Sequence, residues 1–323
     1  MMTKMHRELT LEFVRVTEAA ALACGRLLGR GDKNGADALA VEAMRRLFDS
    51  INIEGTVVIG EGEMDEAPML FIGEKVGNGQ GPKVDIAVDP LEGTNLVAKG
   101  LPGAIACIAV APEGCLLHAP DMYMEKIAVG PESAGMIDIN WPVRKNLEAV
   151  AKAKQKSISE VTLICLDRER HSQIIRQARE AGARIRLITD GDVSAAVSTA
   201  IENSGIDIMI GTGGAPEGVL AAAALKCMGG EFQGRLIPMN DAEKVRVLEM
   251  GLELGKVLYL NDLVKTDDVF FSSTGISDGD LLRGVRYYGN GIAKTQSIVM
   301  RGTTGTIRII EATHHLAQKQ WNF

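Results

Sequence analysis

Apolar residues in the first fifty positions recur at spacings of three and four, which is the period of a helix with one buried face. The segments LEFVRVTEAAALACGRLL and ADALAVEAMRRLF therefore predict helices over 9–29 and 36–49. Shorter runs follow, separated by Gly and Pro turns, and they predict strands over 55–60, 69–76, 84–89 and 104–110, with 116–129 also extended. Together these elements indicate an antiparallel sheet with helices packed against it.

The pattern changes after residue 155, where the apolar runs become continuous, as in strands that are buried on both faces. VTLICL, IRLI and IDIMIG predict strands over 161–166, 185–188 and 206–211, with helices over 171–180, 193–203 and 216–228. This alternation of strand and helix is typical of a parallel sheet. The last third returns to strands. We therefore expect an α+β domain over 1–150 and an α/β domain over 151–323, with the boundary near residue 150.

Composition excludes several classes of protein. The 323 residues are 46% hydrophobic, which is ordinary for a packed globule. Net charge is −7 and only 4% of residues are aromatic, so neither a basic field nor a stacking platform for nucleic acid is expected. The N-terminal segment has no signal-peptide core, and no apolar run is long enough for a bilayer. Five scattered cysteines without a CxxC pair fit a reducing cytoplasm.

Carboxylates gather where predicted elements begin or end. Asp89 ends a strand, Pro90 is expected to stop its hydrogen-bond ladder, and Glu92 follows at once. Glu61 comes directly after another strand, in a segment that also carries Glu63, Asp65 and Glu66. Asp37 lies in the first turn of a predicted helix, and Glu217 begins another helix after the glycines of GTGGAP. Taken singly, each is most simply a solvated acid or an acid favoured by a helix dipole.

Taken together, these acids are hard oxygen ligands held on regular elements. Such ligands suit Mg²⁺ or Mn²⁺ better than zinc, whose sites favour His and Cys. Carboxylates that converge without a cation would also repel one another strongly. The spacing alone does not show convergence, but it makes a divalent metal site the hypothesis to test for Asp37, Glu61, Asp89, Glu92 and Glu217.

The segment DPLEGTN resembles the Asp-Pro-x-Asp/Glu-Gly-Thr signature of the lithium-sensitive, metal-dependent sugar phosphatase superfamily, which includes inositol monophosphatase. Along essentially the whole chain, in order, six segments resemble class II fructose-1,6-bisphosphatase of the bacterial type: GDKNGADALAVEAMR, VVIGEGEMDEAPMLFIGE, AVDPLEGTNL, TDGDV, GTGGAPEGVLAAAALK and STGISDGDLLRGV. The resemblance implies a layered α-β-α-β-α sandwich and hydrolysis of fructose 1,6-bisphosphate to fructose 6-phosphate, a gluconeogenic step. It also implies Mn²⁺ or Mg²⁺, at two or more sites, and a homo-oligomer, either dimer or tetramer.

Carried over by position, the resemblance implies one metal on Asp37 and Glu61 and a second on Asp89, Glu92 and Glu217. Thr94 matches the threonine that orients or activates the attacking water, and Lys33 matches a basic residue near the site. Relatives such as inositol monophosphatase usually have Asp where this chain has Glu92.

Strand ends also predict a substrate site, because ligands of open parallel sheets bind beyond the carboxyl ends of the strands. Three successive strand ends here supply a basic pair, an acidic pair and a glycine-rich loop. The basic pair suits a second, non-reacting phosphate and the acidic pair suits sugar hydroxyls, although each alone could be surface charge or a turn. With the resemblance, the implied substrate residues are Glu92, Gly93, Thr94, Tyr123, Arg168, Glu169, Arg170, Asp190, Gly191, Asp192 and Gly214.

Rival functions fail at the level of motifs. GTGGAP lacks the third glycine of a dinucleotide fingerprint, and no GxxxxGK(S/T) or HExxH occurs. Three alternatives stay open: a sedoheptulose-1,7-bisphosphatase, an inositol-phosphate phosphatase, and a non-catalytic sugar-phosphate sensor. The retained acids and Thr94 argue against the sensor.

Overall fold

The computed structural model describes residues 5–62 and 69–319 and divides into two compact units. Unit 1 comprises residues 1–116 and 266–323, and unit 2 comprises residues 117–265. The division therefore differs from the boundary that the sequence pattern placed near residue 150. The reason is pairing: the strand Tyr123–Val129 already belongs to the sheet of unit 2, whereas the strands after residue 266 return to the sheet of unit 1.

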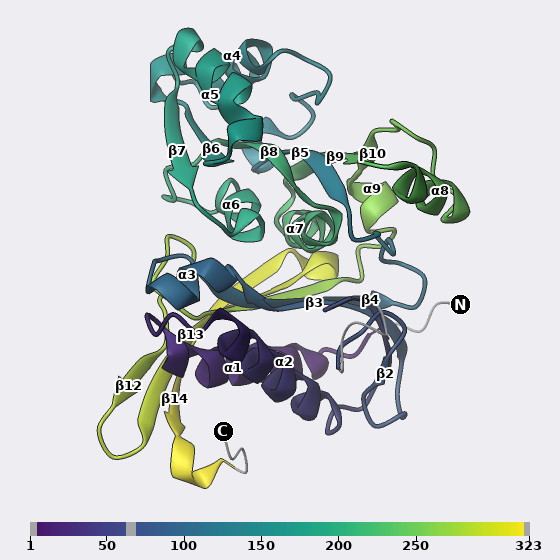
Figure 1. Cartoon of the computed structure of the whole chain (residues 1–323), viewed down its shortest axis with the longest axis vertical. Helices are drawn as coiled ribbons and strands as arrows, with labels where there is room; N and C mark the ends of the chain where they lie inside the picture. The colour runs from purple at the N-terminus through teal and green to yellow at the C-terminus, as the bar shows by residue number, and fades with distance from the viewer. Residues whose placement is uncertain (1–4, 63–68, 320–323) are drawn as a thin grey trace. The chain divides into compact units, whose positions relative to one another are not determined.

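Unit 1 has two layers, a sheet of eight strands with helices against one face (Figure 1). The strand order is β12-β13-β11-β4-β3-β1-β2. β14 also pairs with β13, along the whole length of that strand. The sheet is mixed, because β1 and β3 run parallel, whereas the sequence predicted an antiparallel sheet. The strands are β1 (Glu54–Ile59), β2 (Lys75–Val76), β3 (Lys83–Glu92), β4 (Ile105–Pro112), β11 (Phe270–Gly275), β12 (Arg286–Tyr288), β13 (Ile292–Arg301) and β14 (Thr306–His315).

Helices α1 (Leu9–Cys24) and α2 (Lys33–Phe48) bury their apolar faces on this sheet, as the helical spacing predicted. Phe13 and Phe48 are fully buried in a core that they share with residues of β3 and β4. A short helix, α3 (Thr94–Lys99), follows β3. The strand predicted over 69–76 is mostly a turn: Leu70 has a left-handed φ of 54°, which breaks the extended backbone, and only Lys75–Val76 pairs.

β3 does not end at Pro90, contrary to the expectation from sequence. The strand continues to Glu92 through a bulge, in which Asp89 pairs with Cys107 and Glu92 with Ile105 of β4. One extra residue is thus accommodated on β3, and proline is tolerated at such a position because a bulge leaves a backbone N–H unpaired.

Unit 2 has three layers. Its six-stranded sheet has the order β10-β9-β5-β8-β6-β7, with α4 and α5 on one face and α6 and α7 on the other (Figure 1). The predicted parallel core is confirmed, because β6 pairs in parallel with both β7 and β8, while β5 and β9 add antiparallel pairs. The α/β class predicted from sequence is also confirmed.

The strands of unit 2 are β5 (Tyr123–Val129), β6 (Thr162–Leu166), β7 (Arg184–Ile188), β8 (Ile208–Gly214), β9 (Glu231–Ile237) and β10 (Leu258–Tyr259). Its helices are α4 (Val143–Ala153), α5 (Ser172–Ala181), α6 (Asp192–Ser198), α7 (Ala215–Met228), α8 (Asp241–Glu249) and α9 (Leu260–Leu263). Across the described part of the chain, no helix combines the length and apolar character that a membrane span requires.

Candidate functional site

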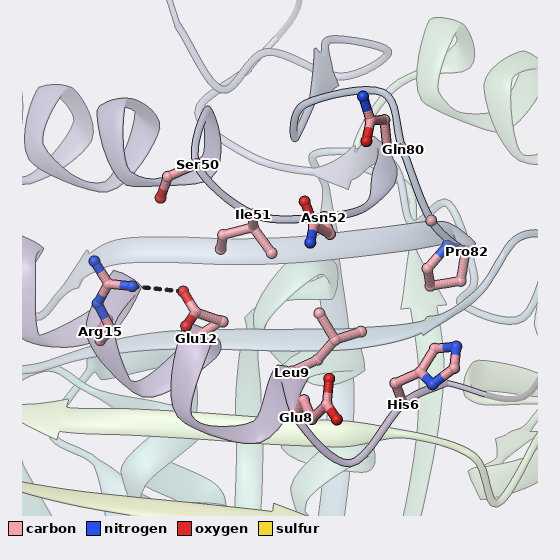
Figure 2. Close-up of a pocket in the computed structure, with 11 residues that line it drawn as sticks. His6, Glu8, Leu9, Glu12, Arg15, Ser50, Ile51, Asn52, Gln80 and Pro82 are labelled. Atoms are coloured by element: carbon pink, nitrogen blue, oxygen red, sulfur yellow. Dashed lines mark hydrogen bonds and ion pairs between the residues drawn. The ribbon is translucent and has the colours of Figure 1, made fainter.

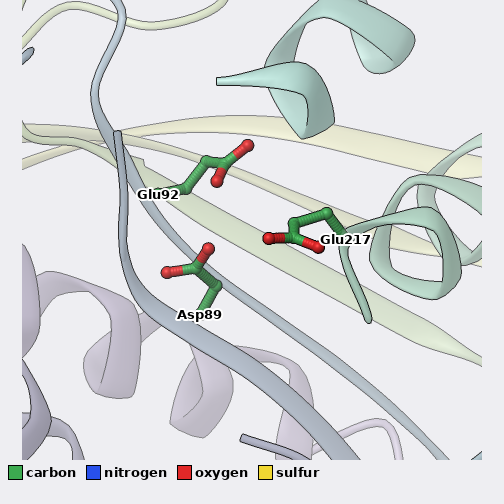
Figure 3. A group of neighbouring side chains, drawn as sticks. All are labelled: Asp89, Glu92 and Glu217. Carbon is green, nitrogen blue, oxygen red and sulfur yellow. The ribbon is translucent and has the colours of Figure 1, made fainter. Parts of the chain in front are cut away.

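The bulge in β3 explains how two acids of one strand come together. Residues three apart on a regular strand point to opposite faces, but the extra residue between Asp89 and Glu92 brings both side chains to one side. Their carboxylates approach within 4.8 Å (Figure 3). Asp89 is oriented by the N–H of Leu91, which donates to its Oδ1 at 3.0 Å, and Glu92 is only 6% exposed. Two like charges this close and this sheltered suit a divalent cation.

Gly93 and Thr94 follow at once and begin α3. Gly93 has a left-handed φ of 94°, and a Cβ on it would lie 2.9 Å from a side-chain carbon of Leu96, so the turn requires glycine. Gly93 occupies the N-cap position, which leaves Thr94 as the first helical residue. The simplest structural role for the Thr94 hydroxyl, capping this helix, is therefore not the one it plays.

A second acidic pair in unit 1 is Asp37 with Glu61. Burial, and then the charge of Asp37, raise the pKa of Glu61 from 4.5 to about 7. Burial also raises the pKa of Asp37, while Lys33, one turn earlier in α2, lowers it. The helix begins at Lys33, so Asp37 lies in its second turn rather than the first, and the dipole accounts for it less well.

The backbone fixes Glu61 tightly at the end of β1. Its N–H donates to the carbonyl of Leu70 at 3.0 Å. The preceding Gly60 admits this approach, because a Cβ there would lie 1.9 Å from the same carbonyl oxygen. The neighbouring acids of the sequence segment, Glu63, Asp65 and Glu66, lie outside the described residues.

Glu217 lies in the first turn of α7 in unit 2, just after Pro216 (Figure 3). Within the described part of the chain its Oε2 is buried and has no hydrogen-bond partner. Burial raises the pKa of Glu217, an effect that Lys126 opposes and Asp192 reinforces. An unsatisfied buried carboxylate oxygen costs free energy, and a bound cation removes that cost. The buried, unpartnered carboxylate oxygen of Glu217 is therefore suited to bind a metal ion.

The predicted substrate residues of unit 2 lie at one edge of its sheet. Because β6, β7 and β8 are parallel, the loops that follow them emerge at the same edge, and Tyr123 joins them as the pairing partner of Gly214. Arg170 donates through Nε and Nη2 to the carbonyl of Thr212, at 3.1 and 2.9 Å, and lies over the Tyr123 ring at 5.1 Å. Arg168 instead donates to the carbonyl of Thr189 at 2.7 Å.

Asp192 is held by a residue that the sequence analysis did not identify. Its Oδ2 lies 2.7 Å from Nζ of Lys126, and both side chains are buried, at 6% and 1% exposure. A Cβ on Gly213 would lie 1.9 Å from the same oxygen, so glycine is required there. Lys126 was detectable as a charge inside the apolar strand YMEKIAV, where a buried lysine needs an acidic partner. Asp190, by contrast, lies in a bend that follows β7 and is partly exposed.

Two cavities can be compared with the positions of the predicted site residues. The larger, about 600 Å³, lies in unit 1 beside the start of α1 and contains the Arg15–Glu12 ion pair, but none of the predicted site residues lines it (Figure 2). The smaller, about 480 Å³, lies in unit 2 and is lined in part by Arg168, Glu169, Arg176 and Arg179. Only the second cavity is lined by predicted site residues, Arg168 and Glu169, and its three arginines are balanced by the carboxylates of Asp167, Glu169 and Glu180.

Comparison with known proteins gives a consistent result. A family profile described as bacterial fructose-1,6-bisphosphatase, glpX-encoded, matches residues 7–314. The chain is 50% identical over 328 aligned positions to fructose-1,6-bisphosphatase 1 class 2 of Escherichia coli (strain K12), which covers 98% of this chain and 97% of the relative. The same values hold for fructose-1,6-bisphosphatase class 2 of Shigella flexneri.

Among solved structures, similarity is found to the extragenic suppressor protein suhB from Bartonella henselae. It has 12% identity and a TM-score of 0.34, and it covers 60% of this chain and 74% of that chain. An inositol monophosphatase from Anabaena (Nostoc) sp. PCC 7120 has 15% identity and a TM-score of 0.32, with 60% of this chain and 72% of that chain covered.

Proposed function

Since the chain belongs to the family of bacterial, glpX-encoded fructose-1,6-bisphosphatases, we propose that it hydrolyses the 1-phosphate of fructose 1,6-bisphosphate and leaves fructose 6-phosphate. The observation that carries the proposal is 50% identity over nearly the full length of both chains. The reaction is a step of gluconeogenesis.

Two groups of acids hold divalent ions in this proposal. Asp37 and Glu61 bind one ion, and Asp89, Glu92 and Glu217 bind another, Mn²⁺ or Mg²⁺ in each case. The support is chemical: every donor is a hard carboxylate oxygen, Glu217 has a buried oxygen without a partner among the described residues, and Glu61 is poorly stable as a lone anion. When bound, the ions neutralise phosphate charge and lower the pKa of water.

The chain's own groups then position the reactants. The hydroxyl of Thr94, which is not a helix cap, orients the attacking water toward the phosphorus, while Lys33 adds positive charge beside the acids. Arg168 and Arg170 hold the phosphate that is not hydrolysed, and Tyr123, Gly214 and the acids Asp190 and Asp192 form the sugar site with Glu92, Gly93, Glu169 and Gly191. Two positively charged guanidinium groups at one sheet edge support this assignment.

The test is phosphate release from a small panel of substrates with added Mn²⁺ or Mg²⁺. Fructose 1,6-bisphosphate should be hydrolysed with the highest kcat/KM, and EDTA should abolish release. Sedoheptulose 1,7-bisphosphate and inositol 1-phosphate test the two alternative phosphatases. Binding of the bisphosphate without any turnover, in protein with verified metal, would instead establish a sensor and refute the proposal.

A further inference from the structure

His171 lies where two strands of unit 2 separate. β6 and β8 pair at Leu163–Ile208 and Ile164–Met209, and beyond this point the imidazole joins them. Its Nδ1 lies 2.8 Å from the carbonyl oxygen of Leu166, the last residue of β6, and its Nε2 lies 2.8 Å from the backbone nitrogen of Thr212 in β8. The side chain is fully buried. One ring thus replaces the backbone ladder near the ends of the two strands.

Only one tautomer satisfies both contacts. The Thr212 N–H can only donate, so Nε2 must accept with its lone pair, and the Leu166 carbonyl can only accept, so Nδ1 must carry the proton. Burial lowers the pKa of His171, although its backbone hydrogen bonds oppose this effect, which favours the neutral ring that this arrangement requires. The imidazole is therefore a fixed connector with one donor end and one acceptor end.

The connector joins β8 to the loop after β6, which carries the two proposed phosphate-binding arginines. Leu166 precedes the loop of Arg168 and Arg170. Thr212 is held on both sides, because His171 accepts its N–H and Arg170 donates twice to its carbonyl. Arg170 itself is exposed and accessible to an anion. The position of its guanidinium thus depends on the backbone of Thr212, and the imidazole holds that residue from its other side.

We propose that His171 is a positioning residue for substrate specificity: it holds Thr212, and through Thr212 holds Arg170, in the place that binds the non-reacting phosphate of a sugar bisphosphate. The inference rests on the proposed function and extends it to a residue that does not touch the substrate. It distinguishes His171 from an ordinary buried histidine, which would contribute to stability alone.

Two substitutions separate the ends of the ring. His171→Asn keeps an N–H near the position of Nδ1 and loses the acceptor for Thr212, whereas His171→Gln can place an amide oxygen near the position of Nε2. With fructose 1,6-bisphosphate, the Asn variant should raise KM roughly tenfold, the effect of losing one buried hydrogen bond, with kcat changed less than about twofold. The Gln variant should recover a large part of this loss.

Three controls make the result specific. Fructose 1-phosphate lacks the second phosphate, so its KM should change less than about twofold in the same variants. His314→Asn alters another buried histidine, one bonded to the Thr295 hydroxyl at 2.7 Å in unit 1, and should lower Tm while leaving KM unchanged. In Arg170→Ala, adding His171→Asn should raise KM no further, because His171 acts on the phosphate through Thr212 and Arg170.

The outcomes divide clearly. A selective rise of KM for the bisphosphate, rescue by Gln and non-additivity with Arg170→Ala support the inference. Unchanged KM in the Asn variant, or an equal rise for both substrates, overturns it while leaving the proposed function intact. If the Asn variant does not fold, the additivity of the Gln variant with Arg170→Ala decides instead, since fully additive effects overturn the inference. A wild-type protein that releases no phosphate from fructose 1,6-bisphosphate refutes the proposed function and the inference together.

Discussion

Glu61 should make the stability of the metal-free protein depend on pH in an unusual direction. Burial and the neighbouring Asp37 raise the pKa of Glu61 from 4.5 to about 7 in the folded state. The folded protein therefore binds this proton more tightly than the unfolded chain does, so the stabilisation is full below pH 4.5 and is lost as pH rises through 7. Most carboxylates act in the opposite sense, because ion pairs and hydrogen bonds usually lower their pKa.

The magnitude follows from the size of the shift. A shift from 4.5 to about 7 corresponds to about 3 kcal/mol over the full range, of which about 2–3 kcal/mol falls between pH 5 and pH 8. Glu61→Gln keeps the shape of the side chain and removes its titration. Between pH 5 and pH 8 the free energy of unfolding of the variant should therefore fall by about 2–3 kcal/mol less than that of the wild type. Titrating groups that do not interact with Glu61 cancel in the comparison, whereas Asp37 titrates more readily once the charge of Glu61 is removed.

The assay is urea unfolding in EDTA at pH 5, 6, 7 and 8, for wild type, Glu61→Gln and the exposed-carboxylate control Glu113→Gln. The control should follow the wild type. Binding of Mn²⁺ requires the deprotonated carboxylate, so the apparent Kd of the wild type for Mn²⁺ should rise about tenfold from pH 8 to pH 6. If wild type and Glu61→Gln show parallel pH profiles of stability, the assignment of a buried, raised-pKa carboxyl is refuted.

The remaining predictions concern other residues of the proposed site. Asp89→Asn should weaken Mn²⁺ binding and turnover together, and near-normal turnover at low metal would show that Asp89 is not a ligand. Thr94→Ala should lose roughly 10²–10⁴-fold in kcat with Tm nearly unchanged, and Thr94→Ser should retain much more; an active but destabilised Thr94→Ala would contradict the proposed role. Gly214→Ala places a Cβ 2.0 Å from Oε2 of Glu217, so metal affinity should fall even though no ligand is removed, as Mn²⁺ titration can check.

The periodicity of the sequence predicted most elements because it reflects burial directly. Helices α1 and α7 and strands β4 and β6 lie close to their predicted ranges, since their apolar residues alternate or cluster as each environment requires. The local pattern could not predict which strands pair with one another. It did not show that β11 returns to the sheet of unit 1, or that β1 runs parallel to β3, because these contacts join residues that are distant in sequence.

Contacts between residues that are distant in sequence also decide which candidate residues could be identified from the sequence. Asp89 and Glu92 were identified by their chemistry, but Pro90 was expected to end the strand, whereas a bulge carries the strand through it and explains how both acids share a side. Lys126 and His171 were not identified because neither has its partner in its own segment. Their roles come from partners far along the chain, Asp192 and Thr212, that only the folded sheet brings near.

The glycines of GTGGAP show how one sequence feature can serve different chemistry from the one its appearance suggests. Glycine-rich turns before helices commonly let a phosphate approach the backbone, and this segment lacks the pattern of a dinucleotide loop. Here the missing side chains make room for carboxylates: Asp192 occupies the space that a Cβ of Gly213 would fill, and Glu217 the space of a Cβ of Gly214. Both acids are thereby sheltered against the backbone, Asp192 with Lys126 as its counter-charge and Glu217 with a buried oxygen that has no partner among the described residues. A buried carboxylate is costly unless it is paired, and the protein pairs only Asp192, with Lys126. This difference supports the proposal that Glu217 binds a cation.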